Sequence, residues 1–190
     1  MKKMILIAAA AFAAVTALAQ PKFAHVNSTE LIQLCPEMDK ARETMNAAQL
    51  EAQETFGDMQ TEFNTKLQAY QSKGSTWTDA IRQSKEKELT EIQQRIQEFS
   101  QTVQMELQQQ EQQLMQPIYQ KINDTIQELA KKGGYIYVFD SNAVLYLDET
   151  QSHDLTPEAR RALNIPADRT LESLAAELQA QQQAAMAAQQ

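Results

Sequence analysis

The stretch YIYVFDSNAVLYL, residues 135–147, contains two runs of β-branched and aromatic residues on either side of Asp140, Ser141 and Asn142. Residues of these types are enriched in strands, whereas Asp, Ser and Asn are enriched in turns. The stretch therefore predicts a β-hairpin with strands at 135–139 and 143–147. Because each run is nearly continuous in strand-forming residues, we expect both faces of these strands to be covered.

The hundred or so residues before this stretch are rich in Gln, Glu, Lys and Leu, and their apolar residues recur at steps of three and four. In residues 36–72 these positions are Met38, Ala41, Met45, Ala48, Ala52, Phe56, Met59, Phe63, Leu67 and Tyr70. A second stripe fills residues 79–132 and stops before Gly133 and Gly134. This spacing predicts a long antiparallel helical hairpin over residues 36–132, coiled-coil-like, with its tip at 72–79.

A two-stranded β-hairpin is marginally stable alone, and one more strand in residues 20–35 makes only a small sheet. We therefore expect partner strands from another chain. Residues 20–35 and 133–166, the latter with a short helix after the hairpin, would form a small body. The fold class is then α+β, with a helical hairpin on a β-rich assembly body. The side chains expected in that body are Phe23, Val26, Ile136, Val138, Phe139, Val144 and Tyr146.

Residues 1–19 have the pattern of an export signal. Lys2 and Lys3 precede an apolar run, and Ala17-Leu18-Ala19 supplies the small residues of a cleavage site. The apolar run is shorter than the roughly 20 residues that a membrane-spanning helix needs. We expect cleavage after Ala19 and export of the remaining chain.

Charge and cysteine content exclude several classes of protein. Without Lys2 and Lys3, the chain has 15 basic against 25 acidic residues, a formal charge of −10, which is unfavourable for binding nucleic acid. Cys35 is the single cysteine, so no internal disulfide can form. Leu34 and Pro36 flank it with no nearby base, which favours a packing role over a catalytic one.

Motifs for catalysis and for cofactors are missing from the sequence. Gly133 and Gly134 precede a predicted strand and not a helix, so they do not form a phosphate loop. His25 and His153 lie far apart, with no ligand-spaced partners around them. We expect no cofactor, no metal and no enzymatic activity.

Basic residues concentrate around the tip of the predicted helical hairpin. They are Lys66, Lys73, Arg82, Lys85 and Lys87, and they outnumber Asp79 and Glu86 in the same region by three charges. Two interpretations remain open. The charges form ordinary helix-surface ion pairs, or the tip contacts acidic chains or anionic lipid.

The first predicted helix is rich in methionine, a flexible side chain suited to varied apolar contacts. Met38, Met45, Met59 and Phe63 would pack against the second helix, and some of them would also contact a bound chain. At the other end of the sequence, residues 167–190 carry a short leucine stripe that decays into an Ala/Gln-rich tail. This tail is either weakly helical or disordered.

Taken together, the export signal, KFAHVN at 22–27, the helical hairpin and GYIYVFDSNAVLYLDETQSHDLT at 134–156 resemble the Skp/OmpH family of periplasmic chaperones. The resemblance is tightest over 134–156, and the helices match mainly in pattern. It implies a periplasmic homotrimer in which strands of three chains form a small barrel and three helical hairpins surround a cavity. It also implies an ATP-independent holdase for unfolded outer-membrane proteins, with at most peripheral membrane contact.

The sequence departs from better-known family members, which are strongly basic, whereas this chain is acidic. Some members carry a lipopolysaccharide-binding cluster of cations on the arm, but residues 104–116 contain no cation, so that activity is not expected here. A second hypothesis stays open. The protein could be a structural or scaffolding coiled-coil protein of the envelope that binds a folded partner.

Overall fold

The computed structural model describes residues 21–188, which fall into two compact units. One unit contains residues 21–35 and 120–188, and the other contains residues 36–119. The expected export signal and its cleavage site after Ala19 lie outside the described residues.

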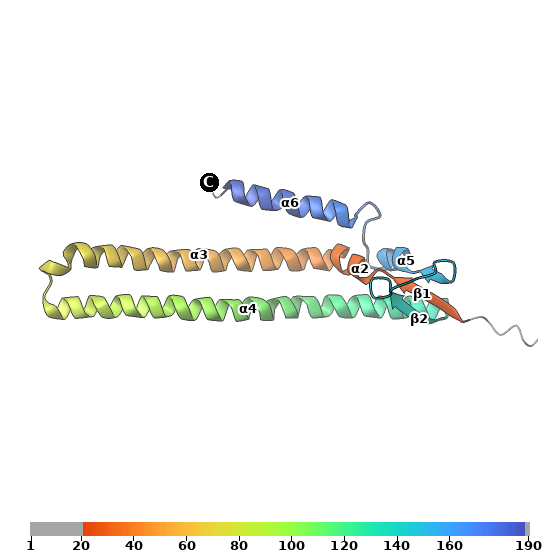
Figure 1. Cartoon of the computed structure of the whole chain (residues 1–190), viewed down its shortest axis with the longest axis horizontal. Helices are drawn as coiled ribbons and strands as arrows, with labels where there is room; N and C mark the ends of the chain where they lie inside the picture. The colour runs from red at the N-terminus through yellow and green to blue at the C-terminus, as the bar shows by residue number, and fades with distance from the viewer. Residues whose placement is uncertain (1–20, 189–190) are drawn as a thin grey trace, which may run out of the picture. The chain divides into compact units, whose positions relative to one another are not determined.

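The unit of residues 36–119 is a pair of antiparallel helices (Figure 1). Helix α3 spans Pro36–Lys73, the 3-10 turn η1 spans Gly74–Thr76, and helix α4 spans Asp79–Gly133, of which residues 79–119 belong to this unit. The mostly helical character expected from the apolar spacing is confirmed. Pro117 lies inside α4, and the helix continues through it to Gly133.

In part of the contact between α3 and α4, small side chains of α3 lie opposite larger apolar side chains of α4. Ala48 and Ala52 of α3 share a groove lining with Phe99, Val103 and Leu107 of α4. Only a few side chains of this unit are completely buried, and Ile92, at 1% exposure, is the largest of them. Two helices alone cannot enclose a core, so most of the apolar stripe is half-buried.

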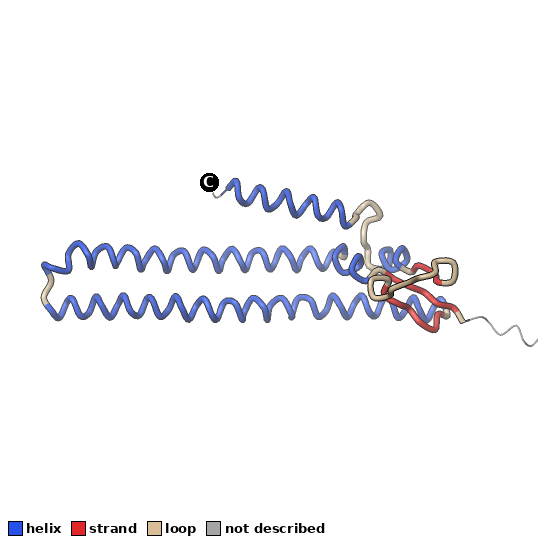
Figure 2. Tube along the Cα trace, viewed as in Figure 1, coloured by secondary structure: helices blue, strands red, loops and turns tan. Residues whose placement is uncertain are grey.

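The other unit is built around a three-stranded sheet with the order β2-β1-β3, drawn in red in Figure 2. Its strands are β1 at Lys22–Val26, β2 at Tyr135–Asp140 and β3 at Ser152–Asp154. Both β2 and β3 run parallel to the central strand β1. Helix α2 (Ser28–Leu34) follows β1, and α5 (Thr156–Ala162) and α6 (Leu171–Ala188) complete the unit.

The predicted β-hairpin is wrong. Residues 135–140 form β2, but residues 144–147 are not a strand, and β2 pairs in parallel with β1. Asp140 and Ala143 close a turn through the Ala143 N–H and the Asp140 carbonyl oxygen, 3.0 Å apart, while the Ser141 N–H donates to Val26. The turn is thereby bonded to β1, and residues 144–147 have no strand partner within the single chain. Several large side chains of β2 are exposed in the single chain, so one chain by itself does not cover both faces of this strand.

The core of this unit lies between the sheet and the short helices. Its buried apolar side chains are Ala24, Val26, Leu31, Leu34, Cys35, Ile122, Leu155, Ala159, Leu163, Ile165 and Leu174. Helix α2 contacts both α5 and α6. Burying a leucine of this kind contributes about 1.5–3 kcal/mol. Cys35 is part of this core, and its Sγ lies 3.4 Å from the carbonyl oxygen of Ile32, in agreement with a packing role.

Of the two alternatives for the tail, the structure has the helical one. Thr170 and Ser173 cap the start of α6 reciprocally, because the hydroxyl of each accepts the backbone N–H of the other at 3.0 and 3.1 Å. Leu174 is buried, and Arg160 braces the preceding loop by donating to the carbonyl oxygens of Pro166 and Arg169. The first turn of α6 is therefore fixed to the unit that holds the sheet.

Candidate functional site

The sheet unit carries a group of large apolar side chains that its own chain leaves uncovered. They are Ile136, Tyr137 and Phe139 of β2 together with Leu145 and Tyr146 of the following segment. Leu145 is fully exposed and Tyr146 is 83% exposed. We call these five residues the apolar sheet surface. Exposure of five large apolar side chains within residues 136–146 is unusual for a protein that works as a monomer.

Two aromatic rings of this surface, those of Tyr137 and Phe139, stack in a row with the half-buried Phe23. Phe23 of β1 and Tyr137 of β2 are register partners, and their rings are nearly parallel with centroids 6.3 Å apart. The ring of Phe139 follows at 5.9 Å from that of Tyr137. The row is held by strand pairing, so the aromatic surface is rigid before any partner arrives.

The structure places the expected body residues at different depths. Val26 is buried, Phe23, Val138 and Val144 are half-buried, and Ile136, Phe139 and Tyr146 are exposed. Strand pairing brings Phe23, Val26, Val138 and Phe139 into one sheet. Our sequence reasoning missed Tyr137 and Leu145, although each lies inside a run that was singled out, at a position adjacent to residues that were chosen.

A polar network joins the three short motifs that carried the family resemblance. The Asn142 side-chain amide donates to Asn27 Oδ1 at 2.8 Å and to Asp140 Oδ1 at 3.2 Å. The backbone N–H of Asn27 donates to the Thr156 hydroxyl at 3.0 Å. The Thr156 N–H in turn donates to Asp154 at 2.8 Å. HVN at 25–27, DSN at 140–142 and DLT at 154–156 therefore meet at Asn27.

Asp140 anchors this network. Desolvation raises the pKa of the Asp140 carboxyl, but hydrogen bonds from Ser28 and Asn142 outweigh it and hold that pKa below its ordinary value. The carboxylate is thus ionised and accepts from both neighbours. The turn that follows β2 is oriented by these bonds, and so is the start of the exposed segment at 144–147.

Replacing Asn142 with alanine is expected to loosen this turn. The substitution removes the bonds to Asn27 and Asp140, at about 0.5–1.5 kcal/mol each, so the free energy of unfolding should fall by about 1–3 kcal/mol. Urea unfolding followed by circular dichroism measures the change. Thr150→Ala, at an exposed turn outside the network, is the control and should have a smaller effect. Equal effects of the two variants would contradict the network.

The predicted basic tip is largely neutralised by neighbouring carboxylates. Lys66 and Lys85 both bond Glu88, Arg82 lies 3.8 Å from Asp79, and Lys87 lies 3.6 Å from Glu91. Within the described chain, no ion pair is found for Lys73. Of the five predicted tip cations, Lys66 and Lys85 therefore meet at one carboxylate, that of Glu88. Lys73, Arg82 and Lys87 do not share this partner.

The triad of Lys66, Glu88 and Lys85 joins α3 to α4. Hydrogen bonds from Lys66 and Lys85 lower the pKa of Glu88 to about 2, and the bond to Glu88 raises the pKa of Lys66. A bond from the Tyr70 hydroxyl to Glu86 links the same two helices and raises the pKa of Tyr70. These contacts are solvent-exposed, so salt screens them.

Acid is expected to remove the contribution of Glu88 to the helical pair. Its folded-state pKa of about 2 lies below the ordinary value of 4.5, so its stabilisation is present above about pH 4.5 and is lost as the pH falls toward 2. Thermal melts of the native protein and of Glu88→Gln should differ most at pH 7, and the difference should shrink as the pH falls from 4.5 toward 2. An unchanged difference at pH 3 would show that the triad does not act through charge.

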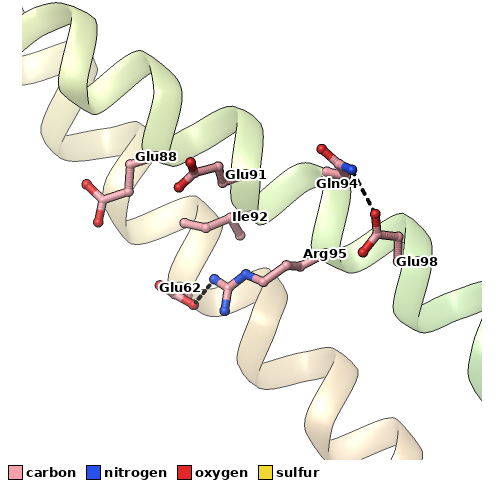
Figure 3. A pocket seen from close by; sticks show the side chains of 7 residues that line it. All are labelled: Glu62, Glu88, Glu91, Ile92, Gln94, Arg95 and Glu98. Carbon is pink, nitrogen blue, oxygen red and sulfur yellow. Dashed lines mark hydrogen bonds and ion pairs between the residues drawn. The ribbon is translucent and has the colours of Figure 1, made fainter.

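The grooves along the helical pair include a larger and a smaller one, which differ in their lining residues. The larger, of about 480 Å³, lies over the buried Ile92 and is lined by Glu62, Glu88, Glu91, Gln94, Arg95 and Glu98 (Figure 3). Arg95 reaches across it to Glu62 at 3.0 Å. The smaller, of about 260 Å³, is the groove between Ala48 and Ala52 of α3 and Phe99, Val103 and Leu107 of α4, and Glu51, Thr55, Glu106 and Gln110 also line it. Both are surface features of the seam, and neither gathers a nucleophile and a base.

The expected apolar contact residues lie on this seam. Met38, Met45, Met59 and Phe63 are all half-buried in α3, so each packs in the seam and keeps part of its surface accessible. Among residues 21–188, the His, Cys, Asp and Glu side chains form no cluster of three or more that could hold a metal ion. In the same range, no helix has both the length and the apolar character needed to cross a membrane.

Comparison with known proteins gives consistent matches. The family model described as "Outer membrane protein (OmpH-like)" matches residues 22–163. The chain is 30% identical over 149 residues to Chaperone protein Skp of Yersinia enterocolitica, covering 78% of this chain and 89% of that protein. It is 38% identical over 141 residues to Chaperone protein Skp of Yersinia pestis, covering 74% and 84%.

A solved structure shares the fold. It is the crystal structure of a putative outer membrane chaperone (OmpH-like) from Caulobacter crescentus, with a TM-score of 0.68 and 18% sequence identity. The match covers 80% of this chain and 92% of that one. Helix α6 lies beyond the residues that the family model matches.

Proposed function

This chain belongs to the OmpH-like family, and on that basis we propose that it is an ATP-independent periplasmic holdase that encloses unfolded outer-membrane proteins and prevents their aggregation. Its relatives are named as chaperones, which supports a chaperone role. We place its action in the periplasm, after removal of residues 1–19. No cofactor takes part in this function.

The observation that carries the proposal is the apolar sheet surface. Tyr137, Leu145 and Tyr146 are exposed in the single chain, beside a small sheet whose edge strand β2 has a free side. An exposed apolar surface next to an unpaired strand edge favours association with another chain. We propose that three copies cover this surface mutually, so that each contributes one helical pair to a common cavity.

Clients would be held by many weak contacts along the helical pairs. Half-buried methionines and the apolar side chains of the smaller groove offer apolar surface, and the polar side chains that also line this groove offer hydrogen bonds, which together suit chains of varied sequence. Three arms acting on one client raise the effective affinity far above that of any single contact. The proposed role consists of reversible, noncovalent binding, so it requires no nucleotide hydrolysis.

Aggregation of an unfolded outer-membrane β-barrel on dilution from urea tests the function directly. The mature protein, without ATP, is expected to suppress light scattering when present in slight molar excess as trimer. The Leu145→Ser/Tyr146→Ser variant, discussed below, should suppress it less because its arms are no longer gathered. Undiminished aggregation at several-fold excess of trimer would contradict the holdase role.

A scaffolding role remains the second candidate. Its support is the long, charged helical pair, in which the ion pairs Lys66–Glu88 and Arg95–Glu62 hold the two helices together as a surface of fixed shape for a folded partner. The same dilution experiment separates the two candidates, because a scaffold would bind the folded partner and leave aggregation unchanged.

A further inference from the structure

A buried histidine lies in the middle of the sheet, and the proposed function does not use it. His25 belongs to β1, the central strand, and is 8% exposed. Its Nδ1 lies 2.9 Å from the Ser152 hydroxyl oxygen, and its Nε2 lies 3.9 Å from Asp154 Oδ1. Both partners belong to β3. Each ring nitrogen of His25 therefore faces an oxygen of the same neighbouring strand.

Strand register places this group on the same face of the sheet as part of the apolar sheet surface. His25 is the register partner of Phe139 in β2 and of Asp154 in β3. Register partners of neighbouring strands point to the same face, and the strands lie about 5 Å apart, so the three residues form a row of about 10 Å. Phe139 is 42% exposed, and the Asp154 side chain is 51% exposed. A second copy that covers Phe139 therefore also covers His25 and comes within reach of Asp154.

Asp154 is the charged side chain that faces His25 in the described part of the chain. The rest of this face consists of aromatic side chains and one serine, and they are Phe23, Tyr137, Phe139 and Ser152. Helix α5 adds a backbone donor, the Thr156 N–H, which lies 2.8 Å from Asp154 Oδ1. The charged and titratable groups on the opposite face, where Ala24 and Val26 point, are Lys22, Asp140, His153 and Glu158.

Covering this face makes the charge of the His25–Asp154 pair decisive. While the imidazole is neutral, the pair carries the negative charge of Asp154, and burying an uncompensated carboxylate is costly. One added proton removes the net charge of the pair, and histidine is the side chain that ordinarily changes charge between about pH 5 and 8. We propose that association of this chain takes up a proton at the His25–Asp154 pair, so that the assembly is stronger at pH 6 than at pH 8. The inference rests on the proposed assembly through the apolar sheet surface and adds its regulation by pH.

The association constant measured at several pH values tests the proposal. Dilution series of the mature chain are followed by sedimentation equilibrium at pH 6, 7 and 8 and at constant ionic strength. Uptake of one proton per chain changes the association constant by up to about tenfold per pH unit. We therefore expect association to be at least about tenfold weaker at pH 8 than at pH 6. Equal association constants at pH 6 and pH 8 would overturn the proposal.

Two variants of the pair give opposite expectations. His25→Gln removes the titrating ring, so the difference between pH 6 and pH 8 should disappear. Asp154→Asn leaves His25 without a charged partner, so covering the face then favours the neutral imidazole. Its association should therefore be stronger at pH 8 than at pH 6. The asparagine side chain keeps an oxygen for the Thr156 N–H, and circular dichroism checks that both variants are folded.

His153→Gln is the matched control. His153 is the other histidine of the chain, it lies on the opposite face, and its Nε2 is 3.3 Å from Glu158 Oε1. The control should keep the native pH dependence. If the dependence disappears in His153→Gln, or if Asp154→Asn behaves like the native protein, the proton is bound elsewhere and the proposal is wrong.

Failure of this inference differs from failure of the proposed function. Suppression of aggregation at pH 6 alone reports the holdase role and does not depend on the titration. A trimer of equal strength at pH 6 and pH 8 overturns the proton uptake and leaves the holdase role standing. A chain that is monomeric at both pH values at micromolar concentration overturns the proposed assembly together with this inference.

Discussion

Replacing Leu145 and Tyr146 with serine is expected to convert the proposed trimer into monomers without unfolding the chain. Both side chains are exposed in the single chain, so the substitutions remove little from its own packing. In an assembly that buries them, each contributes about 1.5–3 kcal/mol, so each chain loses about 3–6 kcal/mol of association energy. Because every 1.4 kcal/mol is about tenfold, the association constant should fall at least about a hundredfold.

Light scattering at micromolar concentration measures this change, and circular dichroism checks that helix content is retained. Leu50→Ser/Met105→Ser is the matched control, since these side chains are also exposed but lie on the helical pair. The control should remain assembled. Dissociation of the control alone, or an unchanged mass for both variants, would place the interface elsewhere.

Replacing Val138 with aspartate is expected to have a larger effect, because it damages the sheet itself. Val138 is half-buried in β2, opposite the completely buried Ala24 of β1. Burying an unpaired carboxylate there costs several kcal/mol, which is comparable to the whole stability of a small domain. Both the sheet unit and the assembly should be lost, while residues 36–119 keep much of their helicity.

Val138→Ala separates the charge from the loss of volume. It removes two methyl groups and adds no charge, so it should cost only about 1–2 kcal/mol and leave the assembly intact at micromolar concentration. Thermal unfolding measured at two wavelengths, one for helix and one for tyrosine packing, distinguishes the two units. If Val138→Asp melts like the native protein, β2 does not pack as described.

Helices in this chain were predictable because their signal is local. The step of three and four runs unbroken through residues 36–72, and the structure has α3 at Pro36–Lys73. The strand after Asp140 was not predictable in the same way. AVLYL has the composition of a strand, but in the single chain β2 pairs with β1 and not with residues 143–147. The composition of residues 143–147 gives their strand propensity, but whether they form a strand depends on pairing with another strand, which composition does not reveal.

Charge at the tip shows a second limit. Counting over residues 66–87 gave an excess of three positive charges, yet Glu88 lies one position beyond that count and bonds both Lys66 and Lys85. The pairing with Lys66 crosses between helices and depends on their register, which the spacing alone does not give. Likewise, the sequence did not reveal that Asn142 and Thr156 would both hydrogen-bond Asn27, because these residues are more than 100 positions apart and only the fold brings them together.

The molar mass of the complex formed with one unfolded outer-membrane protein tests the central claim most directly. A defined barrel protein is diluted from urea into an excess of the mature chain, and the soluble complex is measured by size exclusion with multi-angle light scattering. Three copies of this chain with one client are predicted, in the absence of nucleotide. A complex with a single copy, or a client that precipitates and leaves the chain free, would contradict the account.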